Sequence, residues 1–119
     1  MSKFNILNKA ETVMAYVLTI TNKSPKKLRC DIIPNLRNTA SLVLEDIIRA
    51  NICDIKDNHE NRKSYQQEAK VMLRVLEAFS EICVKANYIT KHQFEVLTKH
   101  TCELYDMIVK WEESDSHRV

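Results

Sequence analysis

Apolar residues recur every three or four positions along most of the chain, which predicts four amphipathic helices. The first covers about residues 8–22 and the second about residues 34–54. The second is the most apolar, because Leu44, Ile48 and Ile52 widen its stripe beyond what a one-sided surface helix needs. We therefore expect this helix to be covered on more than one side, either by its own chain alone or also by a copy of itself.

The third helix is expected from residue 59 or 61 to residue 87, and the fourth from about residue 91. Along the third helix, successive apolar positions are separated alternately by four and three residues. This spacing is typical of helices packed at a shallow angle in bundles. The positions are Tyr65, Ala69, Met72, Leu76, Phe79, Cys83 and Ala86. The fourth stripe contains Phe94, Leu97, Thr101, Leu104, Ile108 and Trp111 and leads into a polar tail at about residues 113–119.

Local signals mark where helices begin. Ser24 and Pro25 form a suitable N-cap and N1 pair, and Pro34 predicts a kink or a fresh start. We expect a short helical turn, a bend and then the long second helix. Polar residues 54–62 predict a loop.

The start of the fourth helix is the sharpest boundary. Thr90 and Gln93 have the spacing of a capping box, and Ile89 is placed to pack onto Phe94 across it. Because this connection is very short, the third and fourth helices must be antiparallel neighbours.

Composition supports an all-α fold, because the chain has no glycine and only two prolines. Tight β-hairpin turns usually need glycine at positive φ. A length of 119 residues suits one domain, residues 1–119. Four helices with short connections predict an up-down-up-down antiparallel four-helix bundle.

The sequence indicates a cytoplasmic protein without a membrane segment. No run approaches the roughly 20 apolar residues that span a bilayer, and the N-terminus lacks the features of a signal peptide. The four cysteines stand singly, so we expect reduced thiols rather than disulfides or a zinc site.

No catalytic motif is present, and we interpret the chain as a non-enzyme without cofactor, metal or small-molecule substrate. The histidines are isolated, and His100 and Cys102 are two residues apart, so they should face different sides of a helix. Glu-x-x-His pairs on core stripes, which build di-iron sites in bundles, are missing.

The net charge is only +2, but charged residues of one sign are clustered along the chain. This clustering predicts a charge-polarised molecule. Residues 23–37 and 62–74 are basic, and residues 95–119 are acidic. The basic residues are Lys23, Lys26, Lys27, Arg29, Arg37, Arg62, Lys63, Lys70 and Arg74. These clusters are either solvated faces or contacts for a phosphate backbone or an acidic protein. No aromatic residue interleaves with them, so base stacking is not indicated.

Several stretches together resemble a known family. They are residues 24–26 (SPK), 36–38 (LRN), 44–51 (LEDIIRAN), 73–76 (LRVL) and 88–95 (YITKHQFE), followed by Trp111. Over about residues 10–113 the chain is similar to the accessory variability determinant (Avd) proteins of diversity-generating retroelements. That family is related to the four-helix proteins encoded by intervening sequences in 23S ribosomal RNA genes.

The resemblance implies a bacterial or phage-encoded four-helix bundle that assembles into a ring-like homopentamer. It implies association with the retroelement's reverse transcriptase and with RNA or DNA, in support of mutagenic retrohoming. Lys26, Arg37 and Arg74 stand where the family is basic. The alternative is a structural or interaction bundle of the intervening-sequence type that does not contact nucleic acid.

Overall fold

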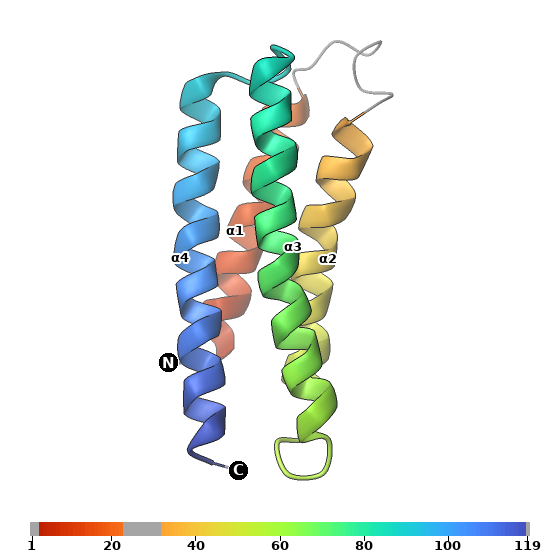
Figure 1. The fold of residues 1–119 in the computed structure, drawn as a ribbon, viewed down its shortest axis with the longest axis vertical. Coiled ribbons are helices and arrows are strands. Elements are labelled where there is room, and N and C mark those ends of the chain that lie inside the picture. The colour runs from red at the N-terminus through yellow and green to blue at the C-terminus, as the bar shows by residue number, and fades with distance from the viewer. Residues whose placement is uncertain (1–2, 23–31, 119) are drawn as a thin grey trace.

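The computed structural model describes residues 3–22 and 32–118, and it confirms the predicted all-α fold. The helices are α1 (Lys3–Asn22), α2 (Ile33–Ile52), α3 (His59–Lys85) and α4 (Lys91–Ser116). They run up, down, up and down, as Figure 1 shows. The end of α1, the start of α2, the end of α3 and the start of α4 therefore share one end of the bundle.

Each helix packs against two neighbours around one core. α1 lies against α2 and α4, and α3 lies against the same two helices. The core is built from the inward stripes of all four helices. The largest apolar side chains that are fully buried are Ile6, Val13, Val17, Ile33, Leu36, Ile47, Leu73, Leu76, Leu97, Leu104 and Ile108.

The start of α2 agrees with the expectation of a fresh start at Pro34. This proline occupies the first turn of α2, where its missing N–H costs no hydrogen bond. The Leu36 N–H donates to the carbonyl oxygen of Ile32 at 2.9 Å. The predicted cap pair Ser24 and Pro25 and most of the predicted short turn lie outside the described residues.

The link between α3 and α4 turns sharply without glycine. Asn87 adopts a positive φ of 63°, and the Tyr88 N–H reaches back to the Cys83 carbonyl oxygen at 2.8 Å. This closes α3 in the way that glycine usually does, because asparagine tolerates the left-handed region.

The capping box at the start of α4 is confirmed. The Gln93 N–H donates to Thr90 Oγ1 at 3.0 Å, and the Thr90 N–H donates to Gln93 Oε1 at 2.9 Å. Ile89 is buried, and Phe94 packs against the same core.

Other details differ from expectation. α1 begins at Lys3, five residues earlier than the pattern predicts, and α4 continues to Ser116 where a polar tail is expected. The third stripe is right at Ala69, Leu76 and Cys83, but Ala86 is exposed. The structure also buries Gln66, Leu73 and Ser80, which the predicted stripe omits.

Candidate functional site

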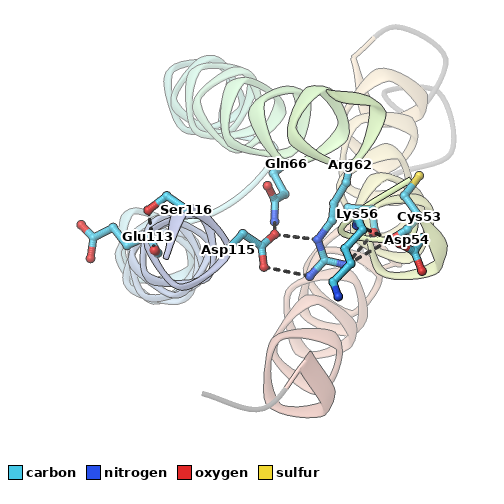
Figure 2. Close-up of polar contacts among 9 residues, drawn as sticks. Cys53, Asp54, Lys56, Arg62, Gln66, Glu113, Asp115 and Ser116 are labelled. Atoms are coloured by element: carbon cyan, nitrogen blue, oxygen red, sulfur yellow. Dashed lines mark hydrogen bonds and ion pairs between the residues drawn. The ribbon is translucent and has the colours of Figure 1, made fainter. Parts of the chain in front are cut away.

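A buried ion pair joins three helices at the end of the bundle where α4 terminates (Figure 2). Arg62 in the first turn of α3 donates through Nε and Nη2 to the two carboxylate oxygens of Asp115, at 2.6 and 3.0 Å. Arg62 Nη1 reaches the carbonyl oxygens of Ala50 and Cys53, at 3.3 and 3.2 Å, where α2 ends. Gln66 Nε2 completes the cluster by donating to Asp115 at 2.9 Å.

These contacts keep Asp115 ionised inside the fold. Burial alone would raise the pKa of this carboxyl, but hydrogen bonds from Arg62 and Gln66 outweigh burial and lower the pKa below its ordinary value. The Arg62 guanidinium also lies 5.2 Å from the centre of the Trp111 ring. Arg62 is therefore a structural clamp, and its charge is used within the protein rather than on its surface.

The predicted basic residues that the structure describes do not form one surface. Lys70 on α3 pairs with Glu112 at 2.6 Å, and both side chains are mostly buried. Arg74 is half exposed, donates to Glu77 at 2.9 Å and lies 4.0 Å above the Tyr105 ring. The Tyr105 ring therefore contacts the side chains of Lys70 and Arg74 between α3 and α4. It also packs against the core.

Arg37 and Lys63 lie far apart, near opposite ends of the bundle. Arg37 in α2 donates through Nε to Thr21 Oγ1 of α1 at 2.9 Å, which fixes its side chain where the two helices meet. Lys63 is exposed at the start of α3. The remaining predicted positions lie outside the described residues; they are Lys23, Lys26, Lys27 and Arg29.

One end of the bundle nevertheless gathers basic residues from different helices. Arg37 belongs to the start of α2, Lys85 ends α3 and Lys91 begins α4. Lys85 and Lys91 are exposed. Sequence reasoning missed Lys85 and Lys91, because each stands alone along the chain and only the up-down topology brings them together.

The opposite end carries mixed charge and a groove. The groove, of about 300 Å³, lies between the start of α3 and the end of α4. Lys63 and Gln67 line one side, and Glu112 and Ser116 line the other. The groove is also lined by His59, Glu113 and Asp115.

His100 and Cys102 face different neighbours, as predicted. His100 Nδ1 lies 2.8 Å from Lys9 Nζ on α1, and the Tyr16 ring is 5.9 Å from the imidazole ring. Burial, together with the charge of Lys9, lowers the pKa of His100. Cys102 Sγ instead lies 3.6 Å from Glu77 on α3. The two groups therefore cannot form a nucleophile–base pair.

Asp46 is a second buried carboxyl group, but it lacks the partners of Asp115. Its side chain is fully buried in α2, and neither carboxylate oxygen accepts a hydrogen bond. The nearest cation is Arg49 Nη1, 3.5 Å from Oδ1. Burial first and then the charge of Glu68 raise the pKa of Asp46 to about 6, against the opposing charge of Arg49.

Within the described residues, no three His, Cys, Asp or Glu side chains gather closely enough to hold a metal ion. No helix in ranges 3–22 and 32–118 is both long and apolar enough to cross a membrane.

Scans against protein-family models and against curated proteins find no match to this chain.

Proposed function

We propose that this chain is a non-catalytic, oligomeric accessory protein of a diversity-generating retroelement, which binds the reverse transcriptase and nucleic acid. The resemblance over residues 10–113 suggests the role, and the four-helix bundle is the fold that this resemblance implies. The observation that carries the proposal is the basic end formed by Arg37, Lys85 and Lys91.

Phosphate groups are a suitable ligand for a basic end of this kind. Lysine and arginine from several helices neutralise a phosphate backbone without reading its sequence. Lys91 also stands at the start of α4, where the helix dipole favours a nearby anion. A site of this kind would hold RNA or DNA of many sequences, as an accessory of template copying requires.

The alternative is a structural bundle of the intervening-sequence type without nucleic-acid contact. The observation that favours it is the internal use of three predicted contact residues. Arg62 is buried against Asp115, and Lys70 and Arg74 pair with acidic neighbours. Under the first proposal, nucleic acid is therefore bound by the basic end and not by these three residues.

RNA binding across a salt series separates the two proposals. The test variant reverses charge at the basic end with Lys85→Glu and Lys91→Glu, both at exposed positions. The matched control makes the same charge change elsewhere with Lys56→Glu and Lys63→Glu, which are also exposed. If each lysine contacts one phosphate, the test variant should bind more weakly, with a salt slope about 1.4 units shallower for single-stranded RNA.

Equal loss in both variants would indicate attraction by net charge alone and would overturn the assignment of the basic end. No RNA binding by the native chain would favour the structural alternative. The reverse transcriptase is tested separately by co-expression and affinity capture through a tag on this chain. Capture of the polymerase supports the accessory role, and its absence from the eluate contradicts that role.

A further inference from the structure

The outward face of α3 carries an apolar row that the described chain leaves uncovered. Val71, Val75, Ala78 and Ile82 follow one another at intervals of four, three and four residues. Val71 is 55% exposed and Ile82 is 49% exposed, although both are large apolar residues. The opposite face of α3 enters the core, and its two sides meet α2 and α4. This row therefore faces away from the bundle.

The intervals are those of a helix that packs along a partner helix. Alternating steps of four and three keep side chains on one line, and apolar residues at such positions form the seam of a helix pair. The row continues at the same intervals to Glu68 on one side and Lys85 on the other. Its apolar centre thus lies between an acidic and a basic end.

This pattern is complementary to itself when a second α3 runs in the opposite direction. A two-fold axis between Leu76 and Glu77 places Val71 opposite Ile82 and Val75 opposite Ala78. It also places Glu68 opposite Lys85. A parallel partner would instead set Glu68 against Glu68 and Lys85 against Lys85, and like charges disfavour that arrangement.

A second charge pair flanks the seam. Arg74 and Glu81 are seven residues apart on the side of α3 toward α4, and their side chains are 53% and 59% exposed. Within one chain Arg74 pairs with Glu77 at 2.9 Å and Glu81 lies 3.6 Å from Lys85, so a contact between chains would exchange or extend these exposed pairs. In the antiparallel arrangement, Arg74 of one chain and Glu81 of the other lie on the same side of the seam. Their positions differ by about 3 Å along the helix axis. Both copies of the pair form at once, because a two-fold contact uses the same patch twice.

We propose that the outward face of α3 binds the same face of a second copy of this chain, antiparallel and two-fold symmetric. The seam from Glu68 to Lys85 is about 26 Å long at 1.5 Å per residue. One helix pair of this length buries less than the roughly 1,200 Å² at which stable interfaces begin, so the contact should depend on protein concentration.

This contact does not rest on the proposed retroelement function or on a five-membered ring, and Lys85 is the one residue that belongs to both the seam and the basic end. Ring closure needs two different surfaces on each chain, whereas the α3 contact joins identical surfaces. Further exposed apolar residues, Leu18 on α1 and Ile48 and Ile52 on α2, remain outside the α3 contact.

Cysteine cross-linking tests the proposed pairing directly. Cys30, Cys53 and Cys102 are first replaced by serine, while the buried Cys83 is kept. Val71→Cys and Ile82→Cys proteins are then treated with a short bis-maleimide, singly and as a mixture. The mixture should yield dimers joined between positions 71 and 82, identified by peptide mass spectrometry. Each protein alone should yield few, because like positions lie about 16 Å apart along the seam.

Strong cross-linking of Val71→Cys protein alone would indicate a parallel contact and overturn the proposal. Absence of the 71–82 link, in a mixture that still forms oligomers by sedimentation, would assign assembly to another surface and also overturn it.

Charge substitutions supply a second test in solution. Val71→Glu with Ile82→Glu places like charges across the seam and should weaken two-fold association at least tenfold. Val71→Lys with Ile82→Glu places opposite charges across it and should restore part of that loss, but only in the antiparallel arrangement. Ile52→Glu, at an apolar residue that is 77% exposed on α2, is the control and should leave α3 association unchanged. Equal weakening by all three variants would contradict the proposal.

Discussion

Arg62 and Asp46 are charged residues inside the bundle, and their partners give them opposite effects on stability. Arg62 donates hydrogen bonds to both carboxylate oxygens of Asp115 and to two carbonyl groups at the end of α2. The Asp46 oxygens accept no hydrogen bond, and Asp46 has only a longer ion pair with Arg49, at 3.5 Å. A buried charge is tolerated when it is paired and costs free energy when it is not.

Replacing Asp115 with asparagine should leave the Arg62 charge buried and uncompensated. We expect the free energy of unfolding to fall by about 3–5 kcal/mol at pH 7. Because the pKa of Asp115 is lowered by folding, its stabilising contribution is present above the unfolded pKa and lost as pH falls through the folded pKa. The Asp115→Asn protein should therefore lose less stability than the native protein does when the pH is lowered. Urea unfolding between pH 3 and 7 measures both effects.

Glu113→Gln is the matched control, because Glu113 is exposed two residues away on the same helix. It should change the free energy of unfolding by less than about 0.5 kcal/mol. An equally small effect for Asp115→Asn would contradict the role of the ion pair as a clamp.

Asp46 should make the free energy of unfolding change with pH in the direction opposite to the effect of Asp115. Its folded pKa of about 6 lies above the unfolded value, so the folded protein binds more protons between these values. Stability should then fall as pH rises from about 4 to about 7. Asp46→Asn should remove this fall and raise the free energy of unfolding at pH 7 by about 1–3 kcal/mol.

Asp106→Asn, which removes the same charge from an exposed site on α4, controls for net charge. If Asp46→Asn and Asp106→Asn change the free energy of unfolding equally, burial of the Asp46 carboxylate is not the cause of the change in stability.

Which charged residues lie inside was not predictable from the sequence pattern. Arg62 counts as one more basic residue beside Lys63, and its partner is 53 positions away in what reads as a polar tail. Helical periodicity describes neighbours within a few turns, whereas the Arg62–Asp115 pair depends on two helix ends meeting at one end of the bundle. The Thr90–Gln93 capping box was predictable, because all of its atoms belong to four consecutive residues.

At the scale of helices, apolar spacing was sufficient to predict number, order and direction. Errors lie at the ends, where polar residues find partners that spacing does not reveal. α4 continues to Ser116 because Glu112 and Asp115 pair with Lys70 and Arg62 on α3. On α3, the predicted stripe contains the partly buried Tyr65, Met72 and Phe79 in place of the buried Gln66, Leu73 and Ser80.

Leu76 tests the part of the α3 stripe that the structure confirms. Its side chain is fully buried, so Leu76→Ala should lower the free energy of unfolding by about 2–5 kcal/mol through lost burial and a cavity. Leu18→Ala, at a leucine that is 42% exposed on α1, should cost less than about 1 kcal/mol. Urea unfolding of both variants at one protein concentration is the measurement. Similar costs for the two would contradict the burial of Leu76.

Across the whole molecule, charged residues gather at the two ends of the bundle, and exposed apolar residues lie along its sides. The basic end gathers Arg37, Lys85 and Lys91, and the other end carries acidic residues beside the Arg62 clamp. The long sides of the bundle expose apolar residues on α2 and α3.

The solution mass, measured by light scattering after gel filtration at two protein concentrations, tests the account most directly. The proposed accessory function predicts a stable particle of five chains at the lower concentration. The α3 contact predicts larger particles at the higher concentration, which Val71→Glu with Ile82→Glu removes without disturbing the five-chain particle. A dimer that this variant dissociates would support the α3 contact and contradict the ring. A monomer at both concentrations would contradict the account of an assembling accessory protein.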